Sequence, residues 1–146
     1  MIHVRHTAVA EVPIHRAFAY VDDYRNVPDW MFGVDRFQPV SDRLAGLGAV
    51  YDATMRIGPK DLDSRVEIVE WERDRTIVLE SVAGFRAASS WAFTDLGHAT
   101  RLDVDFGYHL PGGIAGRTLG MLIEPVVGTA IRQTEHALRT RLGQLV

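Results

Sequence analysis

Histidine is the side chain most often used for metal binding and for proton transfer near neutral pH. This chain of 146 residues has six histidines, and none is spaced from a second histidine or a carboxylate as in the His-Glu-x-x-His pattern of zinc-binding helices. His3 and His6 fall on opposite faces of a predicted strand, so they cannot hold one ion together. The absence of cysteine excludes thiolate ligands, disulfides and a cysteine nucleophile. We therefore expect no metal site and no cofactor.

Two further catalytic signatures are missing or incomplete. No Gly-x-Ser-x-Gly stretch places a serine at a nucleophile turn. The run from Gly112 to Gly116 is glycine-rich like a phosphate loop, but it lacks the Lys-Ser/Thr ending. The remaining candidates for proton transfer are Tyr51, Arg86, Tyr108 and His109. Because spacing along the chain does not show whether these side chains converge, enzyme activity stays open at this point.

Aromatic and apolar side chains alternate with polar ones along three predicted strands. Such a face usually forms ordinary protein core, but an apolar face with a few polar groups also fits the lining of a ligand pocket. The phenol of a buried tyrosine needs a hydrogen-bond partner, which a ligand could supply. These faces carry Tyr51 and Met55, then Phe85, Trp91 and Phe93, and then Tyr108.

Changes of periodicity place the elements that must position these side chains. Residues 2–12 alternate as a strand, Pro13 precedes a short helix, and Pro28 favours a second short helix or turn. Six more strands follow, and their short connections predict antiparallel neighbours. We expect these strands at 34–40, 49–57, 64–72, 76–83, 85–94 and 100–110.

The last part of the chain returns to a helical period. A continuous helix from Gly113 to Gln144 would span about 48 Å, but Pro125 should kink or split it near residues 121–125. Counting 100° per residue gives one apolar stripe that must be covered by another element. The stripe contains Leu119, Leu122, Ile123, Val126, Ala130, Thr134, Ala137 and Leu145.

Composition limits the class of protein. A length of 146 residues and 47% hydrophobic residues fit a single globular domain over residues 1–146. The 16 basic and 19 acidic residues give a net charge of −3, which argues against a nucleic-acid partner. No run of apolar residues is long enough to span a membrane, and no secretory signal pattern begins the chain. We expect a cytoplasmic protein with no integral membrane association.

Three stretches of the sequence, which together span nearly the whole chain, carry a resemblance to a known family. They are Val12-Pro13 leading through Phe18 to Val27-Pro28-Asp29-Trp30, then Gly97 with Ala99-Thr100-Arg101-Leu102, and then Leu110-Pro111-Gly112-Gly113. In this order they resemble the START-like, helix-grip superfamily (SRPBCC), and within it the bacterial polyketide cyclase/dehydrase and lipid-transport-like family. The resemblance implies an α+β fold in which a curved seven-stranded antiparallel sheet wraps around a long C-terminal helix.

The resemblance also implies a cavity between the sheet and that helix, and a ligand such as a lipid, a quinone or an aromatic polyketide. Trp30 would border the mouth of this cavity, where it either gates entry or anchors the short helices. Arg86 would be a polar contact if a bulge turned it inward. The expected ligand-binding residues are Trp30, Tyr51, Met55, Phe85, Arg86, Trp91, Phe93, Tyr108, Leu119, Leu122, Ile123 and Val126.

Three functions remain open from the sequence. The first is a carrier or sensor for an apolar small molecule. The second is an enzyme of the cyclase or dehydratase kind that uses the tyrosine, arginine and histidine candidates named above. The third is a partner-binding module with a filled core, and the chain could act as a monomer or as a homodimer through an exposed strand edge.

Overall fold

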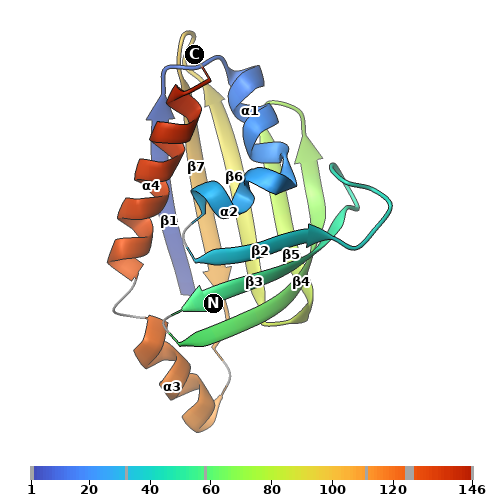
Figure 1. Ribbon diagram of the computed structural model, residues 1–146, viewed down its shortest axis with the longest axis vertical. Coiled ribbons are helices and arrows are strands. Elements are labelled where there is room, and N and C mark those ends of the chain that lie inside the picture. Colours follow the sequence, from blue (N-terminus) through green and yellow to red (C-terminus); the bar gives the residue numbers. More distant parts are fainter. Residues whose placement is uncertain (1, 32, 58, 111, 124–126, 146) are drawn as a thin grey trace.

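A single sheet of seven antiparallel strands curls around helices on its inner face (Figure 1). The computed structural model describes residues 2–31, 33–57, 59–110, 112–123 and 127–145. The spatial order is β1-β7-β6-β5-β4-β3-β2, so each strand from β2 to β6 pairs with the next one in sequence. The connection from β1 to β2 instead joins the two edges of the sheet through the short helices, and β1 pairs with β7. This confirms the seven antiparallel strands expected from the sequence. The strands are β1 (Ile2–Ala10), β2 (Val34–Pro39), β3 (Val50–Ile57), β4 (Lys60–Glu72), β5 (Thr76–Gly84), β6 (Ala87–Asp95) and β7 (Thr100–Tyr108).

Strand alternation decides which side chains face inward. On β7, Leu102 and Val104 are 1% exposed, whereas the preceding Arg101 is open to solvent. On β6, Trp91 and Phe93 are buried on the same side of the sheet, and Trp91 is paired with Val104. The inner face is therefore the apolar and aromatic face that the sequence predicts.

Irregular pairing between β4 and β5 bends the sheet. The register shifts between Arg65 and Val66 and again between Ile68 and Glu70. Each shift inserts an unpaired residue, which increases the local twist and curls the strand. A third shift lies between Val34 and Arg36 on β2. The curl turns the inner face into a concave surface large enough to hold helices.

Short helices close one end of this concave surface. The helix α1 (Ile14–Asp22) starts directly after Pro13, and it buries Ala17, Phe18 and Val21 at helical spacing. A single 3-10 turn, η1 (Tyr24–Asn26), leads into α2 (Val27–Trp30). Pro28 lies in the first turn of α2, where its missing N–H leaves no helical bond unmade.

The C-terminal helical region consists of two helices rather than one continuous helix. The helix α3 (Gly113–Ile123) projects at one end of the molecule, and α4 (Val127–Gly143) runs along β1 (Figure 1). The kink or split was expected near residues 121–125. Met121–Ile123 belong to α3, and Pro125 lies outside the described residues.

The apolar stripe expected on the second half of this region was partly wrong. The buried row on α4 is Thr134, Leu138 and Leu142, at 2%, 0% and 1% exposure. Ala137 and Leu145, which the prediction included, are only half-buried. The prediction counted 100° per residue through Pro125, but the break gives α4 its own phase.

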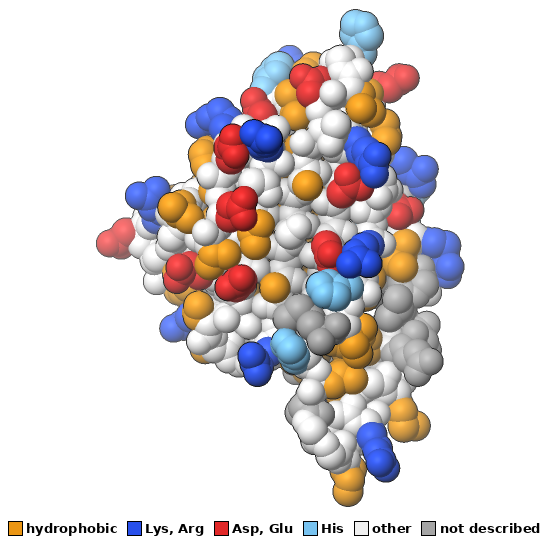
Figure 2. Space-filling view, turned by 180° about the vertical axis from the view of Figure 1, so that it is seen from behind, with side chains coloured by type: hydrophobic (Ala, Val, Ile, Leu, Met, Phe, Trp, Pro, Cys, Tyr) orange, Lys and Arg blue, Asp and Glu red, His pale blue; other side chains and the backbone are white. Residues whose placement is uncertain are grey.

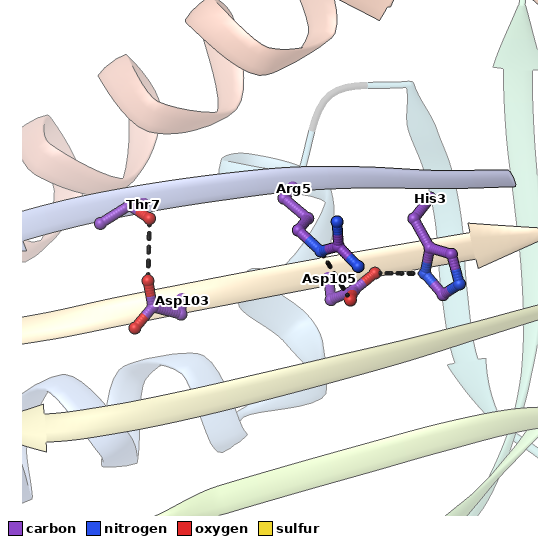
Figure 3. A network of polar contacts seen from close by, with 5 residues as sticks. All are labelled: His3, Arg5, Thr7, Asp103 and Asp105. Atoms are coloured by element: carbon purple, nitrogen blue, oxygen red, sulfur yellow. Dashed lines mark hydrogen bonds and ion pairs between the residues drawn. The ribbon is translucent and has the colours of Figure 1, made fainter.

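The outer face of the sheet carries charged side chains of both signs (Figure 2). Asp105 on β7 accepts hydrogen bonds from His3 Nδ1 at 2.7 Å and from Arg5 Nε at 3.2 Å, and Thr7 Oγ1 donates to Asp103 at 2.8 Å (Figure 3). Exposed pairs of this kind are each worth about 0 to 1 kcal/mol. The outer face is therefore a solvated surface, and the apolar side chains with chemical interest lie inside.

Candidate functional site

A cavity of about 70 Å³ lies between the concave face of the sheet and α2. Every strand except β1 contributes to its lining, because the curled sheet brings the inner faces of distant strands together. The lining is almost entirely apolar and contains two flexible methionines that can fit several shapes. Its larger side chains are Met31, Phe37, Met55, Phe85, Trp91 and Phe106.

Two serine hydroxyls are the polar groups of the lining that lie on the inner face. Ser89 Oγ on β6 accepts a hydrogen bond from Trp91 Nε1 at 2.7 Å. Ser64 Oγ on β4 donates to the carbonyl oxygen of Phe85 at 2.9 Å. The Ser89 hydroxyl proton therefore stays available for an acceptor in the cavity, while Ser64 can accept but has already donated its proton.

Three of the expected ligand-binding residues line this cavity, namely Met55, Phe85 and Trp91. Trp30 and Phe93 instead pack in the main hydrophobic cluster next to it. The Trp30 ring meets the Trp91 ring edge to face with centroids 5.0 Å apart, and Trp30 is 1% exposed. Of the two roles considered for Trp30, this position supports anchoring α2 to the sheet.

Tyr51 also belongs to the main cluster, and its hydroxyl has a protein partner. Tyr51 Oη donates to the carbonyl oxygen of Leu44 at 2.6 Å. Burial raises the pKa of Tyr51 to about 12, with the nearby carboxyl of Asp22 adding to the shift. The phenol therefore stays protonated at neutral pH and fixes the loop between β2 and β3.

A second apolar cluster forms around the base of α3. It contains Tyr108 and the α3 residues Leu119, Leu122 and Ile123, together with Met55 and Phe85 from the cavity lining. Tyr108 is 5% exposed and stacks near Phe85 with ring centroids 6.3 Å apart. These expected residues thus border the cavity rather than line it, and the expected contact at Val126 lies outside the described residues.

Arg86 and His109 do not line the cavity. The Arg86 side chain is exposed on the segment between β5 and β6, and its carbonyl oxygen accepts the backbone N–H of His109 at 3.0 Å. The pKa of His109 is lowered, first by desolvation and then by the N-terminal amine and Arg86. The Arg86 side chain is therefore not turned inward by a bulge, as the sequence had left open.

Several lining residues were not anticipated from the sequence. Val27 comes from α2, and Val34 and Phe37 come from β2. Their contribution depends on how the sheet folds across the short helices, which no local pattern reports. Ser89 could have been found, because it alternates with Ala87 and Trp91 on the predicted aromatic face.

A curled antiparallel sheet that holds helices in its concave face, with an apolar cavity between the two, defines the helix-grip class of fold. The sequence matches the family described as "Polyketide cyclase / dehydrase and lipid transport" over residues 1–143. The chain therefore belongs to this family, which confirms the resemblance noted in the sequence. No curated protein matches the sequence.

Solved structures support the same fold at low sequence identity. The protein TTHA0849 from Thermus thermophilus is 19% identical with a TM-score of 0.80, covering 99% of each chain. A START superfamily protein from Mycobacterium smegmatis is 17% identical with a TM-score of 0.72, also covering 99% of each chain. The Zhui aromatase/cyclase from Streptomyces sp. R1128 is 15% identical with a TM-score of 0.70, covering 98% of this chain and 94% of that one.

The described helices and titratable side chains bear on membrane insertion and on metal binding. None of the described helices is both long and apolar enough to cross a membrane. Within the described residues, no three histidine, aspartate or glutamate side chains gather into a group that could hold a metal ion.

Proposed function

We propose that this protein binds an apolar small molecule between the inner face of the sheet and its helices. The observation that carries the proposal is the cavity itself, which has an aromatic lining and one available hydroxyl proton on Ser89. Pockets that bind small molecules are mostly apolar and use a few polar groups to orient the ligand. The ligand we propose is a lipid, quinone or aromatic polyketide whose carbonyl or hydroxyl oxygen accepts from Ser89.

The size of the cavity sets a condition on this function. A volume of about 70 Å³ is well below the roughly 300 to 1,000 Å³ of pockets for drug-sized ligands. Ligand binding therefore requires side chains to move apart, and Met31 and Met55 are the lining residues with the most rotatable bonds. The second apolar cluster adjoins the lining through Phe85, so a shift of α3 would enlarge the same space.

Native mass spectrometry of protein purified from its own host tests the proposal directly. We expect a bound apolar molecule, or saturable uptake of a fatty acid, a quinone or an aromatic dye by the emptied protein. Consistently empty protein that takes up none of the three probes would contradict it.

Replacing each of two alanines on β6 with leucine tests whether the ligand binds in this cavity. Ala87→Leu puts three extra carbon atoms into the cavity, whereas Ala92→Leu adds the same atoms on the opposite face of the strand. We expect Ala87→Leu to weaken uptake by about tenfold or more and Ala92→Leu to leave it unchanged. Circular dichroism of both variants checks that the fold is kept. Equal uptake by the two variants would place the ligand elsewhere.

A partner-binding module with a filled core is the second candidate, and the small cavity volume favours it. Empty protein and failed uptake would support this function. The cyclase or dehydratase alternative has less support, because Tyr51, Arg86, Tyr108 and His109 do not line the described cavity. An enzyme of this kind would need proton-transfer groups within hydrogen-bond reach of the substrate.

A further inference from the structure

A second hollow shares no lining residue with the apolar cavity. It is a groove of about 480 Å³ lined by α1, η1, the loop between β2 and β3, and the turn between β4 and β5. These segments meet at one end of the molecule (Figure 1). Its volume falls within the range of small-molecule sites, so the groove could hold a ligand without rearrangement.

The walls of this groove are held in place by specific contacts. Tyr51 Oη fixes the carbonyl of Leu44 in the β2–β3 loop at 2.6 Å. The rings of Phe18 and Trp71 meet edge to face with centroids 5.6 Å apart, which ties α1 to the end of β4. A groove whose walls are already ordered loses less entropy on binding a ligand.

Asp22 places a half-buried carboxylate in the groove. Its Oδ1 accepts a hydrogen bond from Trp71 Nε1 at 2.9 Å. No described residue forms an ion pair with it. Asp22 is also the last residue of α1, where the carbonyl ends of the helix disfavour a negative charge. Burial raises the pKa of Asp22, and this effect is larger than the lowering caused by the Trp71 hydrogen bond and by the charge of Arg73. Arg73 already lowers the pKa from outside ion-pair distance, so a second positive charge in direct contact would stabilise the ionised carboxylate further.

Arg73 supplies the opposite charge, on the same Trp71 side chain that donates to Asp22. Its guanidinium carbon lies 5.5 Å from the centroid of the Trp71 ring, a cation–π contact that sets its position. Within the described part of the chain, no carboxylate lies at ion-pair distance from Arg73. An exposed guanidinium with this fixed position is a ready partner for a carboxylate group.

The other charges of the lining do not cancel this arrangement. Asp23 and Arg25 neutralise each other, since Arg25 Nε and Nη2 donate to the two Asp23 oxygens at 3.0 and 2.7 Å. Asp74 at the turn also lies in the lining and adds a negative charge near Arg73, and His15 lies at the exposed rim. The apolar part of the groove comes from Phe18, Ala19 and Leu44.

From this geometry we propose that the groove binds a zwitterionic small molecule with an apolar body, of the kind represented by an apolar amino acid. The ligand ammonium group pairs with the free Asp22 Oδ2, its carboxylate pairs with Arg73, and its side chain packs on Ala19 and Leu44. This site is separate from the apolar cavity and does not rest on the function proposed for it.

A set of three related probes tests the two charges separately. L-leucine carries both charges, N-acetyl-L-leucine lacks the ammonium group, and L-leucinamide lacks the carboxylate. Titrations followed by NMR would monitor the Trp71 indole N–H and the backbone amides of Ala45 and Arg73. We expect saturable shifts with L-leucine and at least fivefold weaker binding of each single-charge probe.

Two variants connect each charge to its residue. Asp22→Asn removes the charge but keeps an oxygen for the Trp71 hydrogen bond, and it should abolish the preference for L-leucine over N-acetyl-L-leucine. Arg73→Gln should abolish the preference for L-leucine over L-leucinamide, and Arg73→Lys should restore much of it. Thermal unfolding checks that each variant is folded.

Several results would overturn the proposal. They are no saturable shift with L-leucine, equal binding of the three probes, or preferences that persist in both Asp22→Asn and Arg73→Gln. Uptake of apolar molecules by the cavity is measured in the same preparations. Ala87→Leu should leave the L-leucine shifts unchanged, so failure of one site is distinguishable from failure of the other.

Discussion

At the residue scale, His6 shows how the inner face of the sheet tolerates a titratable group. It lies on β1 and is 8% exposed, and its Nδ1 has no hydrogen-bond partner among the described residues. Burial lowers its pKa, while the carboxylate of Glu135 and the backbone carbonyl of Ile131 on α4 act in the opposite direction. Neutral His6 therefore belongs to the folded state, since a proton on Nδ1 would be a buried donor without an acceptor.

The lowered pKa of His6 predicts that stability decreases with acidification. As the pH falls through about 6.5, the unfolded chain takes up a proton at this position before the folded chain does. The free energy of unfolding should therefore be higher at about pH 7.5 than at about pH 5.5. Urea unfolding of the wild type and of His6→Leu at both values measures the effect, because the other histidines are common to both proteins. An equal decrease in the two proteins would show that His6 is not responsible.

Tyr51 shows that a buried polar side chain does not by itself indicate a ligand contact. A ligand was considered as the hydrogen-bond partner of this buried phenol. The main-chain carbonyl of Leu44 in the neighbouring loop accepts the hydrogen bond instead. Ser89 shows the reverse case, because a small residue on the aromatic face leaves a donor available to the cavity. The partner of a polar side chain depends on loops and strands that are distant in the sequence.

At the element scale, Gly84 at the end of β5 is the position where the backbone most clearly requires glycine. Its φ is +76°, and an added Cβ would collide with the carbonyl oxygen of Asp63 across the β4–β5 pairing. Gly97 has a similar φ of +91° but open space around it. An added Cβ would therefore cause backbone strain at both positions and a steric collision only at Gly84.

Substitution of these glycines should have unequal effects on stability. Gly97→Ala should lower the free energy of unfolding by about 1 kcal/mol, from backbone strain alone. Gly84→Ala should lower it by about 1 to 3 kcal/mol more, because the β4 backbone has to shift. Chemical denaturation of both variants measures the difference. Equal losses would mean that the β4–β5 pairing adjusts freely around Gly84.

The buried row of α4 gives a second prediction at this scale. Leu138→Ala should lower the free energy of unfolding by about 2 to 5 kcal/mol, because Leu138 is 0% exposed in the main cluster. The neighbouring Arg139→Ala should change it by less than about 0.5 kcal/mol, since Arg139 is exposed. Urea denaturation compares the two, and a small effect of Leu138→Ala would argue against the packing of α4 described above.

The strands could be predicted from the sequence because their ends carry local signals. Gly97 and the turn at residues 73–75 interrupt a period of two, so strand count and hairpin pairing follow. The cavity could not be predicted to the same degree. Phe37 and Met31 reach it only because the sheet curls, and no local pattern in the sequence shows how far it curls.

The phase of α4 could not be predicted for a different reason. The helical period was clear on both sides of Pro125, but a break in a helix erases the angular relation between its two parts. Leu138 therefore appeared off the expected stripe although it is fully buried.

At the scale of the whole molecule, ligand binding and folding stability are linked. A molecule that occupies the cavity only in the folded state stabilises it by about 2.7 kcal/mol at a free concentration of 100 times its dissociation constant. Urea unfolding with and without a probe that the protein takes up measures this increase, and Ala87→Leu is the matched control. Equal stabilisation of the wild type and Ala87→Leu would show that the probe binds outside the cavity.

The pairing of β1 with β7 has a consequence for the order in which the chain folds. Ile2 lies opposite Tyr108, so β1 stays unpaired until a strand about a hundred residues later in the chain has formed. The hairpins from β2 to β7 need only local contacts, whereas this closure joins segments about a hundred residues apart and is entropically slow. Until it occurs, the edge of β7 and the inner face of β1 remain open to other chains. Fast refolding of the hairpins followed by a slower, aggregation-prone closing step is the kinetic behaviour that this topology favours.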